Sequence, residues 1–404
     1  MKRYFSNFIA LDIGSSKISA IAAHITKQGS AQINTQILQH SSGFNSGLIT
    51  NMESAENSII NTIYALEKDC EKSIKEVAIS LSGASTASYY VKHSIKIGNQ
   101  AITSQDIQKL INKALLEFNV NDQEIIHYFP IEFKLDGRQI VENPVSLHAQ
   151  ELSCQLHIVA ANSSMILNLT KCLAKCHVEV SEILLAIYAS GLAVLSQDEM
   201  KLGSIVIDIG ANTASYGIFL DNNLVYSGYV PSGGKSITTE IAKVFSISLK
   251  EAEKLKILYG NANPNLLLRD SVIKLENNEQ TITSAQLIAV IHPQIKDLLL
   301  KIKQQCDSIA MDHLLSQQVV ITGGGAALEG TKSLATDIFQ KQIRLAKPAF
   351  IPGTTENYNP YANTTIIGMI QYKLLRFRNN TFKSDQYHDA GWLKRTFLWL
   401  KENI

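Results

Sequence analysis

The chain has 404 residues, enough for about two to four compact domains. It carries 37 Lys and Arg against 36 Asp and Glu, and a net charge of +1 argues against a protein that grips nucleic-acid backbones as its main work. Hydrophobic residues make up 45% and charged residues 18%, so long disordered stretches are not expected. Five cysteines in this length do not form a disulfide framework, and the composition predicts a reducing cytoplasmic compartment.

Strands and helices alternate along the chain, which predicts an α/β fold. Three strands are expected within 8–38, then a helix over 54–72 and a strand over 76–83. Residues 85–160 form a mixed group of strands with one helix over 104–118, and a second set of strands opens at residue 203. Further helices are expected at 235–245, 249–258 and 284–310, and a buried strand that runs into a glycine-rich turn at 319–325.

One internal repeat divides the chain into two comparable halves. Residues 8–24 (FIALDIGSSKISAIAAH) align without a gap with residues 204–220 (SIVIDIGANTASYGIFL), 196 positions later. Each copy has an apolar strand, Asp-Ile-Gly, two small residues and a second strand. The repeat predicts two halves of one architecture, each built on the same β-hairpin.

The two hairpins carry the residue types that hold a polyphosphate. Each first strand ends in an aspartate, Asp12 or Asp208, which can hold Mg²⁺ through water. The glycines that follow, Gly14 and Gly210, allow close backbone approach and offer N–H groups to an anion. The other candidates in these turns are Ser15, Ser16, Lys17, Ala211, Asn212 and Thr213. Two such turns facing one another would clamp phosphates between two domains.

Two glycine-rich segments add candidates for the same site. One holds three successive glycines between a strand and a helix, with room for a flat ligand or a phosphate at the helix start: Gly323, Gly324 and Gly325. The other, 228–236 (GYVPSGGKS), misses the P-loop pattern, yet Gly233 and Gly234 still suit a nucleotide lining. On the helix that follows, Glu240 and Lys243 could reach a ribose and base; an exposed helix face is the alternative.

The order of two Asp-Ile-Gly hairpins followed by a triple glycine resembles the actin and heat-shock-chaperone ATPase superfamily. The sequence of further segments resembles the bacterial cell-division family FtsA within this superfamily. The resemblance runs essentially end to end, through 119–147, 236–260, 319–330 and 360–372. It implies an actin-like two-lobed α/β fold with duplicated nucleotide-binding subdomains, an inserted α+β subdomain in the first lobe and a C-terminal amphipathic helix. It also implies ATP and Mg²⁺ as cofactors.

The resemblance further implies a division of labour along the chain. Residues 1–81 with 164–200 would be the first nucleotide-binding subdomain, and 82–163 the inserted subdomain that reaches neighbouring subunits and later division proteins. Residues 201–235 with 301–378 would be the second nucleotide-binding subdomain. Its small companion, 236–300, grips the C-terminal peptide of the tubulin-like FtsZ in this family. Residues 379–390 would be a polar tether, and residues 391–404 would be the membrane-targeting helix.

Several residues depart from the family pattern. The second phosphate hairpin commonly reads Asp-Ile-Gly-Gly-Gly-Thr with an acidic residue two positions on; here Ala211 and Asn212 replace glycines, and Ser215 replaces the acidic residue. Ala186 stands where filament-forming relatives often carry a Glu that orients the attacking water. We therefore assign no catalytic residue, and expect ATP binding with very slow hydrolysis.

The helix expected to face FtsZ departs from the pattern as well. Gln294 stands where the family often has Arg, which removes part of the charge steering of an acidic peptide. Lys296, Lys301 and Lys303 on the same helix are candidates to replace that charge. A solvated helix face is the alternative.

The last fourteen residues have the pattern of a helix that lies in the plane of a membrane surface. At 100° per residue, six large apolar side chains fall within an arc of about 160°: Trp392, Leu393, Phe397, Trp399, Leu400 and Ile404. The cations Lys394, Arg395 and Lys401 lie beyond its edges and suit anionic headgroups. A helix docked on the protein's own core is the alternative.

The sequence therefore predicts an ATP-binding, actin-like protein that tethers FtsZ filaments to the inner face of the cytoplasmic membrane at the division site and associates head to tail with its own copies. A pilus-assembly relative of FtsA is an alternative, although it lacks a basic amphipathic tail of this kind. A sugar or acetate kinase of the superfamily is another, but such a kinase needs a carboxylate base that the cleft positions lack.

Overall fold

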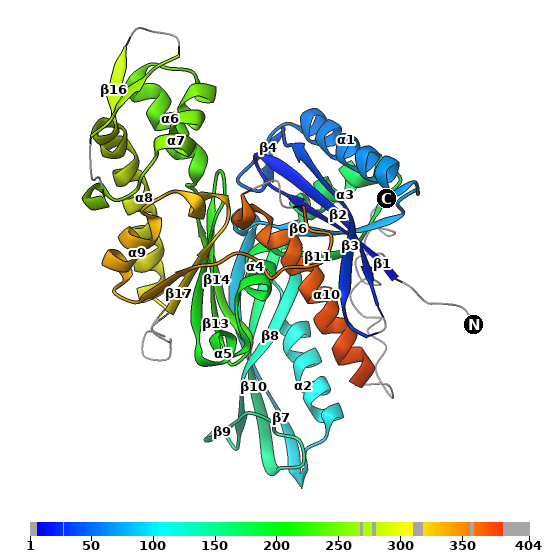
Figure 1. Cartoon of the computed structure of the whole chain (residues 1–404). Helices are drawn as coiled ribbons and strands as arrows, with labels where there is room; N and C mark the ends of the chain where they lie inside the picture. The colour runs from blue at the N-terminus through cyan, green and yellow to red at the C-terminus, as the bar shows by residue number, and fades with distance from the viewer. Residues whose placement is uncertain are drawn as a thin grey trace.

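A computed structural model of the chain describes residues 6–26, 28–266, 270–276, 280–309, 318–355 and 359–382 (Figure 1). Two five-stranded sheets dominate it, with strand orders β3-β2-β1-β6-β11 and β14-β13-β12-β17-β18. In each sheet the first three strands form an antiparallel meander, and the last two run parallel to the strand that ends in aspartate. The duplication predicted from the repeat is confirmed.

The first sheet and its helices, here called the first lobe, come from both sides of a large insertion. Its elements are β1 (Ser6–Ile13), β2 (Lys17–Ile25), β3 (Ala31–His40), β4 (Phe44–Asn45), β5 (Leu48–Ile49), α1 (Met52–Cys70), β6 (Glu76–Leu81), α3 (Ser163–Ala174), β11 (Glu179–Leu185), α4 (Ala186–Val194) and α5 (Gln197–Leu202). Helices α1 and α3 cover one face of this sheet around an apolar core that includes Leu11, Ile59 and Leu173.

The second sheet and its helices form the second lobe. Its sheet side consists of β12 (Ser204–Ile209), β13 (Ala214–Leu220), β14 (Asn223–Val230), β17 (Gln318–Thr322), α9 (Thr331–Phe339), β18 (Gln342–Leu345) and α10 (Thr364–Phe382). A smaller group stands above it: α6 (Gly234–Phe245), α7 (Leu249–Tyr259), β15 (Val272–Lys274), β16 (Thr281–Thr283) and α8 (Ser284–Asp307). The prediction of a tether from residue 379 is wrong for residues 379–382, because α10 continues through Phe382.

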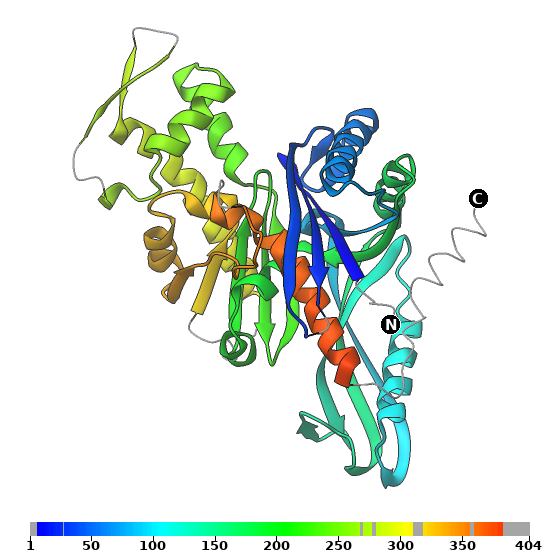
Figure 2. The same cartoon turned by 45° about the vertical axis from the view of Figure 1, so that its right-hand side comes forward.

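Helices α4 and α10 lie between the two sheets, and α10 is visible there in both views (Figures 1 and 2). Their apolar side chains share one core with residues of both sheets, among them Ala10 and Val206. The two helices approach closely because Gly368 has no side chain; a Cβ there would lie 1.8 Å from the Ala189 carbonyl oxygen. This packing joins the lobes below the two hairpin turns.

The inserted subdomain leaves the first lobe after β6 and projects away from the small helical group (Figure 2). It has a four-stranded sheet and one helix: β7 (Thr86–Ala101), α2 (Ser104–Glu117), β8 (Gln123–Leu135), β9 (Gln139–Val141) and β10 (His148–Asn162). Its base contacts β14 of the second lobe. Tyr90 donates to the Val225 carbonyl at 2.8 Å, and the buried His157 donates from Nδ1 to the Leu224 carbonyl at 2.7 Å. The insertion therefore touches both lobes.

Candidate functional site

The two hairpin turns face one another across a cavity of about 1040 Å³. The turns are equivalent in detail, since the Gly14 N–H donates to the Lys17 carbonyl at 3.0 Å and the Gly210 N–H to the Thr213 carbonyl at 2.9 Å. Most of the predicted cofactor residues line this cavity: Asp12, Gly14, Ser15, Ser16, Lys17, Asp208, Gly210, Ala211, Asn212, Thr213, Gly234, Gly323, Gly324 and Gly325. Segments from four distant parts of the sequence thus meet at one site.

Asp12 and Lys17 form the first-lobe side of the site. The Asp12 carboxylate accepts a hydrogen bond from Ser80 Oγ at 2.6 Å. Burial raises the pKa of Asp12, while the Ser80 hydrogen bond and the positive charge of Lys17 oppose that rise. Burial likewise lowers the pKa of Lys17, against the attraction of the two aspartates. The Lys17 Nζ donates to the Ala362 carbonyl at 2.7 Å, so a first-lobe cation reaches the segment that precedes α10.

Asp208 forms the second-lobe side, and hydroxyls from both interior helices hold it. Ser190 Oγ on α4 donates to Asp208 Oδ2 at 2.6 Å, and Thr365 Oγ1 on α10 lies 3.4 Å from the same oxygen. Burial raises the pKa of Asp208 to about 6, and the Ser190 hydrogen bond limits that rise. The sequence reasoning missed Ser80, Ser190 and Thr365, because each is remote in sequence from the aspartate that it holds.

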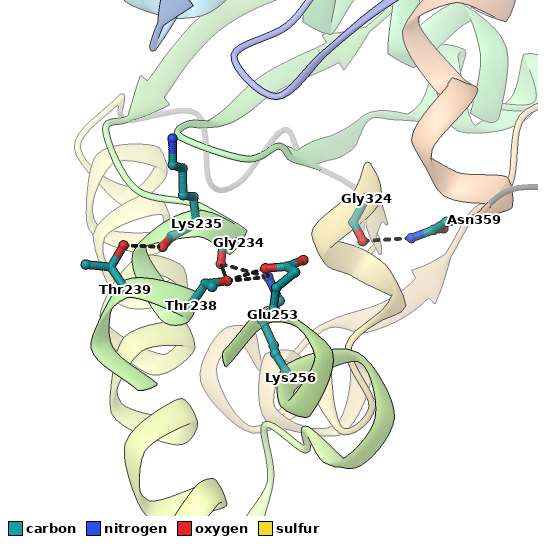
Figure 3. Close-up of polar contacts among 8 residues, drawn as sticks. All are labelled: Gly234, Lys235, Thr238, Thr239, Glu253, Lys256, Gly324 and Asn359. Carbon is teal, nitrogen blue, oxygen red and sulfur yellow. Dashed lines mark hydrogen bonds and ion pairs between the residues drawn. The ribbon is translucent and has the colours of Figure 1, made fainter. Parts of the chain in front are cut away.

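The triple glycine packs directly behind Asp208. Gly323 has a φ of +85°, and a Cβ there would lie 2.2 Å from Asp208 Oδ1. Only glycine satisfies both the left-handed backbone and this approach. Asn359 Nδ2 donates to the Gly324 carbonyl at 3.0 Å and fixes the turn from the other side (Figure 3). A Cβ at residue 325 would lie 2.4 Å from Ile209 Cγ2, so the shape of the cavity wall requires glycine at 323 and at 325.

The two other predicted glycines differ in their roles. Gly234 lines the cavity at the start of α6. Gly233 lies behind the second turn, where a Cβ would come within 2.5 Å of the Gly210 carbonyl oxygen. Close packing of α6 against the hairpin therefore requires glycine at 233.

The contact of Glu240 and Lys243 with a ribose and base stays a prediction. Neither Glu240 nor Lys243 is among the described residues that line the cavity; their side chains, 39% and 69% exposed, lie 3.9 Å apart as a surface ion pair. Glu253 and Lys256 on the next helix, α7, line the cavity instead. Lys256 Nζ donates to Glu253 Oε2 at 2.7 Å, to Thr238 Oγ1 at 2.8 Å and to the Gly234 carbonyl at 3.0 Å (Figure 3). This network joins α6 and α7 at the cavity wall.

The donor set of the cavity fits a magnesium-bound polyphosphate. Three lining side chains have a buried polar atom without a hydrogen-bond partner among the described residues: Ser41 Oγ, Ser82 Oγ and Asn212 Oδ1. Asp12, Asp208 and Lys17 stand beside two turns with free space for a ligand. No group of three or more His, Cys, Asp or Glu suited to a metal occurs in the described part of the chain.

Two positions where relatives often carry a carboxylate also line the cavity. Ala186 begins α4, and Ser215 pairs directly with Asp208 across the hairpin. Neither side chain can act as a general base. The structure thus brings the two departures to the same cavity as the candidate phosphate residues.

The predicted partner-binding residues all lie on α8 but not on one face of it. At 100° per residue, Gln294 and Lys301 fall on one side of the buried stripe and Lys296 and Lys303 on the other. Lys301 forms an ion pair with Asp297 at 2.6 Å, and Lys303 one with Asp307 at 2.7 Å. Lys296 is exposed and has no ion pair among the residues described here.

The predicted membrane helix, 391–404, lies outside the described residues, as does most of the predicted tether. Within the described part of the chain, no helix has both the length and the apolar composition needed to cross a membrane.

Comparisons with known proteins decide the family. A family model described as "Cell division protein FtsA" matches residues 205–368, and one described as "SHS2 domain inserted in FTSA" matches residues 83–160. The chain is 27% identical to the cell division protein FtsA of Buchnera aphidicola and 24% identical to that of Escherichia coli K12, over 98% of both chains in each pair. The chain belongs to the FtsA family. The prediction of an FtsA-type cell-division protein is confirmed.

Solved structures show the fold independently. The PilM-PilN type IV pilus biogenesis complex matches with a TM-score of 0.64 at 15% identity, over 92% of this chain and 98% of that chain. MreB5 of Spiroplasma citri bound to ADP matches with a TM-score of 0.53 at 15% identity, over 92% and 98%. At these identities the likeness concerns the fold alone. The predicted actin-like α/β fold with an inserted subdomain is confirmed.

Proposed function

We propose that this FtsA-family member binds ATP with Mg²⁺ between its lobes and links FtsZ filaments to the cytoplasmic face of the cell membrane at the division site. The observation that carries the proposal is the pairing of two equivalent Asp-Ile-Gly turns across one cavity. Asp12 and Lys17 enter from one lobe and Asp208 from the other, so a bound polyphosphate would contact both.

Each side chain has a defined part in holding the nucleotide. Mg²⁺, bound through water by Asp12 and Asp208, would neutralise phosphate charge. The turn N–H groups and Lys17 would contact the phosphates, and Gly323–Gly325 would border them. Glu253 and Lys256 are better placed than Glu240 and Lys243 for the ribose and base, because they line the cavity. The chain of hydrogen bonds through Thr238 holds the Lys256 ammonium toward α6.

The cavity favours retention of ATP over hydrolysis. Ala186 and Ser215 offer no base to the attacking water, and general-base assistance is worth about 10²–10⁴-fold in rate. Asp12 and Asp208 would be committed to the metal. Binding energy would instead hold the lobes together and favour head-to-tail association of copies.

The remaining segments fit an adaptor. We assign the FtsZ peptide to the small group 236–300, later division proteins and neighbouring subunits to the insertion 82–163, and anionic lipid to 391–404. Residues 1–81 with 164–200 and 201–235 with 301–378 would be the two nucleotide-binding subdomains. Because each membrane helix would bind weakly, many helices along one filament would be needed for firm attachment.

Asp12→Ala tests the central claim. This change removes a carboxylate that the buried cavity positions beside Lys17, and it should abolish binding of ATP with Mg²⁺ in calorimetric titration. Co-sedimentation of the full chain with FtsZ C-terminal peptide, with and without ATP, tests the adaptor role. Wild-type affinity for ATP in the variant would show that the hairpin turns do not form the nucleotide site.

A further inference from the structure

Asn45 and Asn212 join the two lobes at the edge of the cavity. They are 167 residues apart in sequence, and Nδ2 of Asn212 donates a hydrogen bond to Oδ1 of Asn45. Asn212 belongs to the second phosphate turn and lines the cavity, whereas Asn45 is exposed at the end of β4. The turn that would hold phosphate in one lobe is therefore tied directly to a hairpin of the other.

The β4–β5 hairpin is a firm support for Asn45. Its two central residues, Ser46 and Gly47, both have positive φ, 52° and 81°, as in the type I′ turn that suits a tight hairpin. Gly47 packs on Ser82 just after β6, since a Cβ at residue 47 would lie 1.8 Å from Ser82 Oγ. Ser46 Oγ also donates to Asn45 Oδ1 at 3.1 Å, which orients the acceptor toward the second lobe.

Asn212 supplies the donor of the contact, and glycine at this position would have no side chain to make it. Its Oδ1 is buried without a hydrogen-bond partner among the described residues. Burial of this unpaired oxygen costs free energy and offsets part of the hydrogen bond to Asn45, so the closed arrangement can open to admit a ligand.

We propose that Asn45 and Asn212 form a latch that closes the cavity beside the phosphate turns and slows the release of nucleotide. The proposal rests on the proposed binding of ATP. Separation of the lobes at the turns would free a nucleotide held between them, and that separation breaks this hydrogen bond. The latch would make this chain retain its nucleotide longer than a chain with glycine at position 212.

Release of a fluorescent ATP analogue, chased with unlabelled ATP in a stopped-flow instrument, tests the latch. Asn212→Ala and Asn45→Ala should each release the analogue about 3- to 10-fold faster, the effect of one neutral hydrogen bond. Because the two side chains act as one unit, the double variant should be no faster than the faster single variant. Asn112→Ala, which removes an exposed asparagine bonded to Gln108 on α2, should match the wild type. Wild-type release rates in both single variants, or effects that multiply in the double variant, would overturn the proposal.

Hydrogen exchange in the ligand-free chain tests the same contact without nucleotide. Asn212→Ala should speed amide exchange in residues 43–50, where the Thr50 N–H donates to the Gly43 carbonyl at 2.8 Å. If the wild-type chain does not bind the ATP analogue, the proposed function is wrong. The exchange measurement would still show whether Asn45 and Asn212 hold the lobes together. Unchanged exchange in 43–50 would show that Asn45 and Asn212 do not hold the lobes together.

Discussion

Ser190→Ala should make nucleotide binding depend more steeply on pH. In the wild-type chain, Ser190 Oγ donates to Asp208 Oδ2 at 2.6 Å, and this bond favours the ionised carboxylate against a burial that raises its pKa to about 6. Metal and phosphate binding needs the ionised form. Protons therefore compete with Mg²⁺ for the Asp208 carboxylate. Removal of the Ser190 hydroxyl increases the affinity of this carboxylate for the proton.

The size of the effect follows from the hydrogen bond. A bond to a charged acceptor is worth about 1.5 kcal/mol, so its loss raises the pKa of Asp208 by about one unit. The ionised fraction then falls from about nine-tenths to about one-half at pH 7, and from about one-half to about one-tenth at pH 6. Affinity for ATP with Mg²⁺ should drop about twofold at pH 7 and about fivefold at pH 6, with little change above pH 8.

Calorimetric titration at half-unit steps from pH 5.5 to 8.5 measures this profile. Ser204→Ala is the matched control. Ser204 is a buried serine on β12, the strand that carries Asp208, but it lies at the opposite end of that strand and donates to the Glu199 carbonyl at 3.0 Å. The control should keep the wild-type midpoint. A loss of affinity in Ser190→Ala that is the same factor at every pH would show a packing defect, and the electrostatic reasoning would be wrong.

Three further predictions concern turnover, FtsZ and the membrane. The purified chain should hydrolyse ATP far more slowly than once per second, because Ala186 and Ser215 supply no base; a sustained rate of several per second would contradict this. Lys296→Ala should weaken binding of the FtsZ peptide, and reduce the salt dependence of that binding, more than Lys301→Ala, because Lys301 already pairs with Asp297. Equal affinity of the wild-type chain for the peptide at low and high salt would mean that the contact is apolar. Trp399→Glu should release the chain from anionic vesicles in flotation without affecting ATP binding, and equal flotation of variant and wild type would exclude the tail as the anchor.

The local elements were predictable because their signals are local. Apolar runs that end in Asp-Ile-Gly predicted β1 and β12. The repetition of this pattern predicted two equivalent sheets without any information on tertiary contacts. The helix predicted at 104–118 occupies Ser104–Glu117, where Thr103 and Asp106 form a capping box. Such features depend on residues within a few positions of one another.

The choice between two similar helices was not predictable from periodicity. Glu240 and Lys243 on α6 repeat the spacing of Glu253 and Lys256 on α7, so the residue types favour neither pair. Lys256 is 14% exposed and Lys243 69%, because α7 turns its lysine toward Thr238 and the cavity while α6 turns the other pair to solvent. Which face of a helix meets a cavity is decided by segments far away in sequence.

The equivalent aspartates also show how the two halves have diverged around a common turn. Ser80 of the adjacent parallel strand holds Asp12 within its own sheet. The counterpart beside Asp208 is Thr322, but Thr322 bonds Thr364 at 2.7 Å, and Asp208 takes its hydrogen bond from Ser190 of the first lobe. Asp208 is thus held by a helix that enters from the opposite half of the chain. Any movement that separates β12 from α4 would break this hydrogen bond, so the side-chain partner of the second aspartate depends on how closely the lobes are packed.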